Sequence, residues 1–227
     1  MLLQIPDMVA VADTAVANEE LSLRAIDLAI KGGWIMYPLA FLLIAGIYIF
    51  FDRYFAIKSA SKHDENFMQR IKEKIHSGNI DAAKMLCEAT DTPVSRMVAK
   101  GLSRLGRPLN DINTAIENVG NLEIGRLERR LPILASISGG APMIGFLGTV
   151  IGMIRAFYDM ASAGNNIDVT LLSSGIYTAM VTTVAGLIVG IIAYFAYNYL
   201  VSRIEQVVYN LESDTLAFLD VLNEPTV

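Results

Sequence analysis

Long runs without a charged residue are the main feature of the pattern of hydrophobic and polar positions. Residues 32–51, 131–154 and 169–202 contain no Asp, Glu, Lys or Arg. An α-helix rises about 1.5 Å per residue, so about 20 apolar residues cross the hydrocarbon core of a bilayer. The pattern therefore predicts three transmembrane helices, at residues 34–51, 132–158 and 175–200.

Amphipathic patterns continue from two of these spans. From Ile112 onward, apolar residues recur at helical spacing up to the second span, and Pro132 is the only sign of an interruption. We expect one unbroken helix of about 50 residues there. In the loop before it, Gly78, Pro93 and Gly106 with Pro108 are expected to break helices. The third span continues through a second apolar stripe, at Val201, Ile204, Val207, Val208, Leu211 and Leu216.

Basic residues indicate the orientation of the spans. Residues 52–131 carry fourteen Lys and Arg side chains, whereas residues 159–174 carry none. Positively charged connections stay on the cytoplasmic side, so the N-terminus lies outside and the C-terminus lies in the cytoplasm. We expect an all-α integral membrane protein with an outer N-terminal segment (1–33) that includes an amphipathic helix, span one (34–51), a cytoplasmic helical domain (52–131), span two (132–158), an outer loop (159–174), span three (175–200) and a cytoplasmic C-terminal helix (201–227).

Composition agrees with a membrane protein and excludes several other classes. The mean hydropathy is +0.45 and 53% of the residues are hydrophobic, more than a soluble domain of this length carries. No basic patch with interleaved aromatic residues indicates a nucleic-acid partner. Cys87, His63 and His76 are isolated, so we expect no internal disulfide, no metal and no cofactor.

Small residues at a spacing of four recur in the second and third spans. Such residues let membrane helices approach closely, and Pro142 lies in the same stretch. One interpretation is a set of helices packed around a pore, and the other is ordinary packing inside a single subunit. The residues are Pro142, Gly145, Gly148 and Gly152 in span two, with Gly186 and Gly190 in span three.

Hydroxyl side chains accompany these glycines. Thr178 and Thr182 share a face of span three, Thr183 lies next to that face, and Thr149 lies in span two. Each hydroxyl could simply bond a carbonyl of its own helix. Together they favour a polar surface. Because no Asp, Glu, Lys or His lies deep in any span, ion transfer would need an acid from another protein.

Two sequence runs resemble those of a known family. Residues 141–152 read Ala-Pro-Met-Ile-Gly-Phe-Leu-Gly-Thr-Val-Ile-Gly and resemble the second-span signature of the ExbB/TolQ family. Gly175-Ile176, Ala179, Thr183 and Gly186-Leu187 resemble its third-span signature. Segments 127–132 and 77–83 extend the resemblance, which covers about residues 30 to 215.

The resemblance implies a role in energy transduction. Members of this family form a pentameric ring in the inner membrane, in which spans two and three line a pore. An ExbD-like single-span partner in that pore supplies an aspartate, and a TonB-like protein carries the work of proton passage to outer-membrane transport. Thr149 and Thr183 fall on the pore threonines, Thr178 and Thr182 are expected to line the same pathway, and the glycines and Pro142 are expected to pack around it. Protons are favoured over sodium ions.

This chain departs from the family at one position. The family commonly has a glutamate where this chain has Thr178, and we expect Thr178→Glu to leave assembly intact. A TolQ-like stator for envelope integrity or motility and a helical scaffold without ion flow both fit, whereas an enzyme is not expected because no span offers a nucleophile–base pair.

Overall fold

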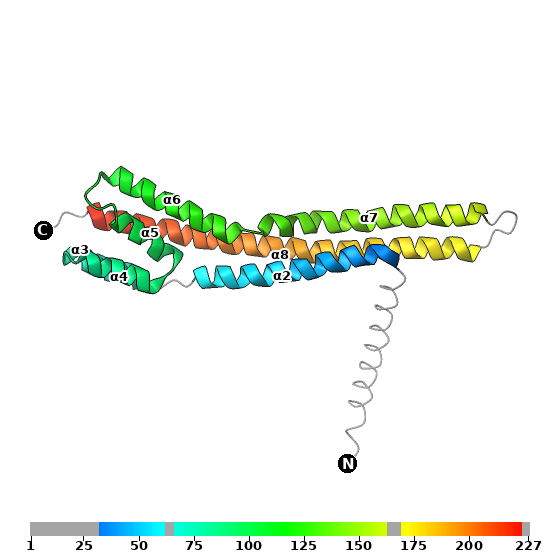
Figure 1. Ribbon diagram of the computed structural model, residues 1–227, viewed down its shortest axis with the longest axis horizontal. Helices are drawn as coiled ribbons and strands as arrows, with labels where there is room; N and C mark the ends of the chain where they lie inside the picture. The colour runs from blue at the N-terminus through cyan, green and yellow to red at the C-terminus, as the bar shows by residue number, and fades with distance from the viewer. Residues whose placement is uncertain (1–31, 62–65, 163–168, 224–227) are drawn as a thin grey trace, which may run out of the picture. The chain divides into compact units, whose positions relative to one another are not determined.

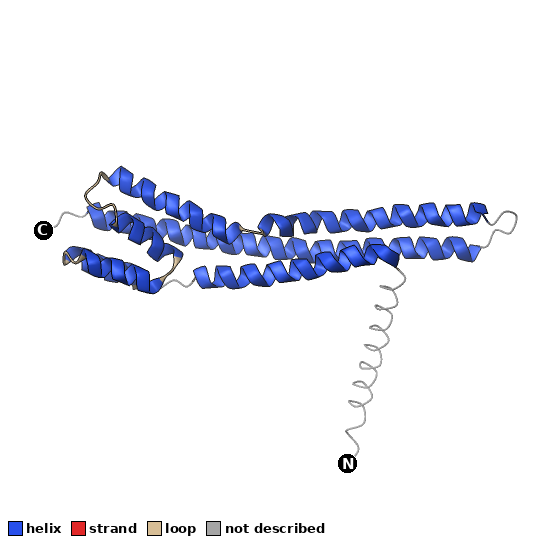
Figure 2. Ribbon diagram, viewed as in Figure 1, coloured by secondary structure: helices blue, strands red, loops and turns tan. Residues whose placement is uncertain are grey.

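The computed structural model describes residues 32–61, 66–162 and 169–223. The elements in these ranges are all helical (Figures 1 and 2). The amphipathic helix expected before residue 32, and His63, lie outside the described residues. The elements are η1 (Gly33–Ile35), α2 (Met36–Ala60), α3 (Phe67–His76), α4 (Ile80–Thr90), α5 (Pro93–Leu102), α6 (Leu109–Glu128), α7 (Leu131–Ser162) and α8 (Val169–Asn223).

Three helical stretches within the described ranges are long and apolar enough to cross a membrane. They lie within Gly33–Ala60, Leu109–Ser162 and Leu172–Asn223, and they contain the three predicted spans. The third belongs to α8, a single helix of 55 residues, or about 80 Å. The prediction of an all-α membrane protein with three spans is therefore confirmed, and so is the extension of span three.

The prediction of one unbroken helix that leads into span two is wrong. Helix α6 ends at Glu128, Arg129 is extended (φ −53°, ψ 131°) and Arg130 is left-handed (φ 72°). The cause is Pro132, which has no N–H for the carbonyl of Glu128 and whose ring would collide with that carbonyl in a continuous helix. A left-handed conformation costs a residue other than glycine about 1–2 kcal/mol, so the packing around Arg130 must offset this strain.

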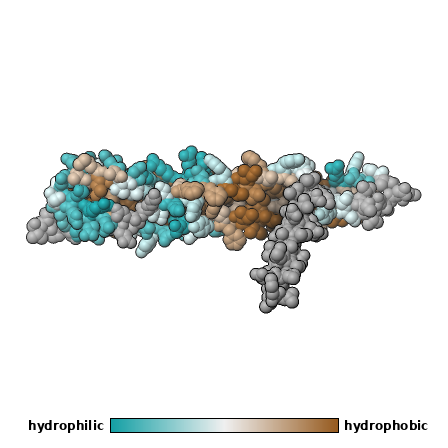
Figure 3. All heavy atoms as spheres, turned by 90° about the horizontal axis from the view of Figure 1, so that it is seen from below, coloured by the Kyte–Doolittle hydropathy of each residue, from teal (hydrophilic) through white to brown (hydrophobic). Residues whose placement is uncertain are grey.

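The residues fall into two compact units. Among the described residues, one unit holds residues 32–46 with those in Ala135–Tyr194, and the other holds those in Ile47–Leu134 with residues 195–223. In the first unit large apolar side chains are exposed: Tyr37 by 78%, Phe41 by 70% and Ile44 by 68%. A stripe of this kind is expected where a helix faces lipid. Figure 3 shows apolar side chains gathered over the middle of α2 and hydrophilic ones over α3 and α4.

The second unit has the core of a water-soluble helical domain. Its buried side chains include Leu102, Ile116 and Phe218, each exposed by 1% or less. The C-terminal part of α8 contributes every third or fourth residue to this core. This is the repeat expected of a helix that packs along one face. These residues are Leu200, Ile204, Val207, Leu211, Asp214, Phe218 and Val221.

Local signals determine where the short helices of this unit begin. The side chain of Asn79 accepts a hydrogen bond from the Ala82 N–H (3.1 Å) and caps α4. Thr92 and Ser95 form a capping box, with Pro93 in the first position of α5. Gly78 and Gly106 adopt positive φ angles of 71° and 88° between helices. The predicted breaks at Gly78, Pro93 and Gly106 with Pro108 are confirmed.

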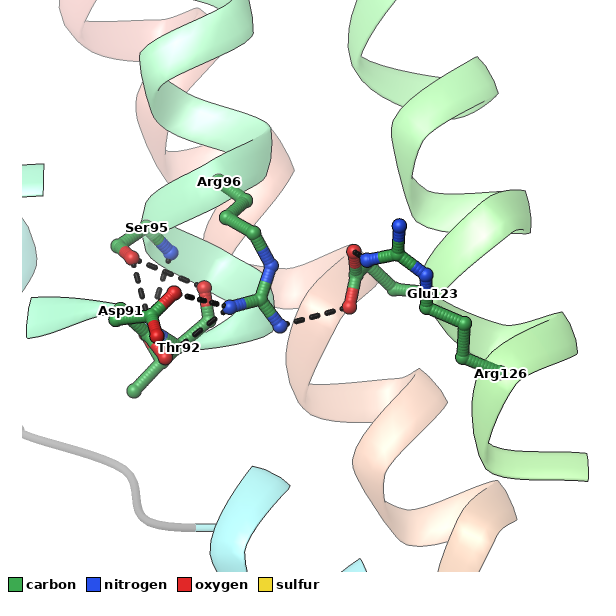
Figure 4. A network of polar contacts seen from close by, with 6 residues as sticks. All are labelled: Asp91, Thr92, Ser95, Arg96, Glu123 and Arg126. Carbon is green, nitrogen blue, oxygen red and sulfur yellow. Dashed lines mark hydrogen bonds and ion pairs between the residues drawn. The ribbon is translucent and has the colours of Figure 1, made fainter. Parts of the chain in front are cut away.

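An ion-pair network joins α5 to α6 in the second unit. The Glu123 carboxylate is 6% exposed and accepts hydrogen bonds from Arg96 (2.7 Å) and Arg126 (2.6 Å), as Figure 4 shows. Arg96 also donates to the Asp91 carboxylate (2.6 Å). The hydrogen bond to Glu123, opposed by desolvation, raises the pKa of the Arg96 guanidinium. Burying two charged partners is tolerated when they are hydrogen-bonded to each other, and this network meets that condition for Glu123 and Arg96.

Candidate functional site

Helices α7 and α8 approach each other so closely that backbone meets backbone. A Cβ atom added at Gly186 would lie 2.7 Å from the Ala141 carbonyl oxygen and 2.8 Å from the Gly145 Cα. One added at Gly145 would lie 3.0 Å from the Gly186 Cα. No side chain fits between these two residues. We call this contact the α7–α8 seam.

The remaining predicted packing residues lie on the same seam. A Cβ at Gly152 would lie 2.9 Å from that of Ala179, and a Cβ at Gly148 would overlap the Thr182 side chain. At Gly190, a Cβ would lie 2.5 Å from the Pro142 Cγ. All six predicted packing residues therefore contact the opposite helix within one chain. This agrees with the simpler interpretation of the glycines, which is packing inside a single subunit. Their place around a pore stays a prediction.

Three of the four predicted hydroxyls donate to backbone carbonyls. Thr183 donates to the Gly145 carbonyl oxygen across the seam (3.1 Å), and Thr149 donates to the Phe146 carbonyl of its own helix (2.6 Å). Thr182 donates to the Ala179 carbonyl (2.7 Å), with the Gly145 oxygen 3.4 Å away. The hydroxyls of Thr149 and Thr183 can still accept hydrogen bonds from water or from an acid.

The seam divides the four threonines. Helices α7 and α8 run antiparallel. Thr149 lies one helical turn after Gly145, on the flank of the seam where Thr183 also lies. The two side chains therefore face the same side. Thr182 is 1% exposed and its side chain packs against Gly148. Within one chain, this position does not favour the expected role in lining the proton pathway.

Thr178 lies on the other flank of the seam. It precedes Thr183 by five residues and therefore points about 140° away around α8. Val181 lies three residues further along α8. A Cβ at Gly32 would meet the Met36 side chain first and then Val181, at 3.4 Å. The flank of Thr178 is therefore the one beside the start of α2.

Charged groups are scarce around the seam. The sequence has no Asp, Glu, Lys or His between residues 131 and 154 or between 169 and 202, and the Arg155 side chain near the end of α7 is exposed. Within the described ranges, no three His, Cys, Asp or Glu side chains gather as metal ligands would. Threonine hydroxyls do not titrate near neutral pH, so the seam can orient water or an acid but cannot hold a proton by itself.

A seam of glycines and threonines in apolar helices agrees with the comparison with known proteins. Residues 89–213, more than half of the chain, match the model of the MotA/TolQ/ExbB proton channel family. The chain belongs to this family. Its three apolar helices and this membership make it a multi-pass membrane protein. The matched region contains all of the predicted site residues.

Individual members of the family show the same relationship. An ExbB homolog of Methanothermobacter thermautotrophicus is 29% identical over 80% of this chain and 64% of its own length. An ExbB-like protein of Synechocystis is 28% identical over 79% of this chain and 71% of its own. The TolQ of Pseudomonas aeruginosa is 29% identical over 70% of this chain and 73% of its own. The chain thus spans just under two thirds of the first of these relatives.

Sequence reasoning missed two charged clusters of the second unit. One is the network around Glu123, and the other joins Asp52 to Arg53 and Arg130. The second cluster had a usable signal. Asp52 directly follows one uncharged run and Arg130 directly precedes another, so both lie where a span is expected to end.

Proposed function

We propose that this chain is the ring-forming stator subunit of a proton-driven motor in the bacterial inner membrane. Several copies, a pentamer by family resemblance, would enclose an ExbD-like single-span partner that supplies a membrane aspartate. The N-terminus would be periplasmic and the C-terminus cytoplasmic. The work would pass to a TonB-like protein for outer-membrane transport.

One observation carries this proposal. Thr149 and Thr183 lie on the same flank of the seam, and the helices that hold them contain no titratable side chain at that depth. Hydroxyls on a shared face can bind and orient water beside an acid. Proton transfer through a membrane needs a titratable group, so the missing acid points to a partner.

The four threonines have different parts in this proposal. Thr149 and Thr183 would face the lumen and the partner's aspartate. Thr182 would support them by filling the seam against Gly148. Thr178 would lie away from the lumen of its own copy, which explains how a neutral residue can occupy this position.

A TolQ-like stator is the second candidate. The TolQ of P. aeruginosa is 29% identical over 70% of this chain, and the ExbB homolog of M. thermautotrophicus is 29% identical over 80% of it. The two candidates share the proton pathway and differ in the protein that receives the work. Complementation of strains that lack either ExbB or TolQ distinguishes them.

Proton flux tests the shared mechanism. The chain and its single-span partner are reconstituted in liposomes, and proton entry is followed with a pH-sensitive dye. We expect Thr149→Ala and Thr183→Ala to abolish flux while the complex stays assembled. Thr114→Ala is the matched control, since the Thr114 hydroxyl also donates to a carbonyl of its own helix, that of Asn110 (2.9 Å), but lies on α6. Full flux in both seam variants would exclude the relay and leave a non-conducting scaffold as the better account.

A further inference from the structure

Asp52 and Arg130 join the ends of two uncharged runs. Asp52 is the first charged residue after residues 32–51, and Arg130 is the last one before residues 131–154. The two residues are 78 positions apart in sequence, yet the Arg130 Nη1 donates to the Asp52 Oδ2 at 2.9 Å. This contact therefore fastens α2 to the turn between α6 and α7.

That turn needs outside support. Pro132 forces the break, Arg130 is held at a φ of 72°, and the last carbonyls of α6 have no partners further along their own helix. Arg53 supplies one such partner, since its Nη1 donates to the Arg126 carbonyl oxygen at 3.1 Å. Two adjacent residues of α2 thus hold both sides of the break.

A single carboxylate oxygen orients both arginines. The Asp52 Oδ2 accepts hydrogen bonds from the Arg53 Nε (2.9 Å) and Nη2 (2.7 Å) in addition to the one from Arg130. Charge-assisted hydrogen bonds of this length are the stronger ones in proteins. If Asp52 were neutral, two guanidinium groups would face each other without the anion between them. Asp52 is therefore the residue on which the arrangement depends.

We propose that Asp52 is a positioning residue for ion transfer, which latches the turn between α6 and α7 to α2. The latch fixes the first residues of α7, the helix that carries Gly145 and Thr149. This inference rests on the proposed function, because it assigns Asp52 a part in the same ion transfer. Asp52 belongs to the second unit and the seam threonines belong to the first, so Asp52 would act only through α7.

Hydrogen exchange and proton flux, measured on the same full-length complex, test the latch. We expect Asp52→Asn to speed amide exchange in residues 126–134 by about tenfold, since local opening no longer breaks a charge-assisted contact. Flux should fall several-fold while the complex keeps its mass. Asp52→Glu, which keeps the carboxylate, should retain most of the flux. Asp81→Asn is the control, because Asp81 pairs with Lys84 only at 4.0 Å on the surface.

A second variant separates the latch from backbone strain. Arg130→Gly removes the guanidinium but relaxes the positive φ, which glycine adopts freely. We expect faster exchange and lower flux in this variant as well. Wild-type behaviour of Arg130→Gly would mean that the Arg130 guanidinium does not hold the turn, and the proposal would be wrong.

The remaining outcomes are equally decisive. Unchanged exchange in Asp52→Asn would show that there is no latch, and faster exchange with wild-type flux would show that the latch has no part in ion transfer. A wild-type complex without flux would count against the proposed function instead. In that case the exchange data would still show whether Asp52 holds the turn.

Discussion

The α7–α8 seam and the network around Glu123 hold helices together by opposite means. At the seam the side chains are small or absent, and Gly145 and Gly186 bring two backbones together. Around Glu123, long charged side chains reach from α5 and α6 to a carboxylate that is only 6% exposed. The seam stabilises through dispersion and close fit, whereas the network exchanges hydration for charge-assisted hydrogen bonds.

The difference follows from the expected surroundings of each region. Lipid tails are as apolar as leucine, so helices within a membrane gain little from burying large apolar side chains and associate through small residues. Helices that pack in water gain stability by burying leucines, and they tolerate buried charges if each charge has a partner. The seam should therefore be sensitive to added volume, and the network should be sensitive to lost charge.

Added volume at the seam should have the largest effect. In Gly186→Val the new side chain would meet the backbone of Ala141 and Gly145, which cannot move aside. We expect the free energy of unfolding to fall by about 3 kcal/mol, which is at the upper end of the destabilisation that overpacking usually causes. Thermal unfolding in detergent measures it. Gly140→Val is the matched control, since a Cβ at Gly140 meets no atom within 4 Å. Equal stability of the two variants would contradict the close approach.

Lost charge in the network should have the next largest effect. Glu123→Gln keeps the shape of the side chain but removes the anion shared by Arg96 and Arg126. We expect a destabilisation of about 2 kcal/mol, the value for hydrogen bonds to a charged group. Glu117→Gln is the control on the same helix, where the residue is exposed and its carboxylate accepts a hydrogen bond from Asn113. If the two variants unfold at the same temperature, the network is not what holds α5 to α6.

A charge placed beside the seam should matter less than one lost from the network. Thr178 is half-buried on the flank away from Thr183, so a glutamate there has room to point outward. We expect Thr178→Glu to assemble normally and to change proton flux only modestly, unlike Thr149→Ala. Native mass and the liposome assay measure both properties. Collapse of the complex would show that residue 178 is enclosed more tightly than this account states.

The smallest effect at neutral pH concerns a buried thiol of the second unit. Desolvation raises the pKa of Cys87 to about 11, so the folded protein keeps a neutral thiol and should react with maleimide only slowly at pH 7. Between pH 9 and 11 the unfolded chain releases this proton and the folded chain does not, so the free energy of unfolding should fall as pH rises. Cys87→Ser should remove that fall. A thiol that reacts as fast as free cysteine would contradict its burial.

Some of this architecture could be predicted because single residues determine it. Uncharged runs locate the spans, and Gly78, Pro93 and Gly106 end or begin helices through backbone properties of their own. The break at Arg129 and Arg130 was missed although its cause was visible. Pro132 lies four residues after Glu128, the distance at which its ring excludes a helical carbonyl.

The finer features depend on contacts that a single helix pattern does not contain. The apolar stripe predicted for α8 includes Leu216, which is 64% exposed, but it does not include Phe218, which is buried. Both residues are apolar, and the partner helices decide which one faces inward. The same holds for the site. Spacing located the small residues of the seam, but the separation of Thr178 from Thr183 became visible only once the contacting faces of α7 and α8 were known.

The most direct test of the central claim is the native mass of the complex purified in detergent, with every co-purifying chain identified. The account predicts several copies of this chain around a single-span protein that carries an aspartate within its membrane segment. That protein would supply the acid which the seam lacks. A bare homo-oligomer whose mass does not change when a candidate partner is co-expressed would contradict the account and favour a helical scaffold.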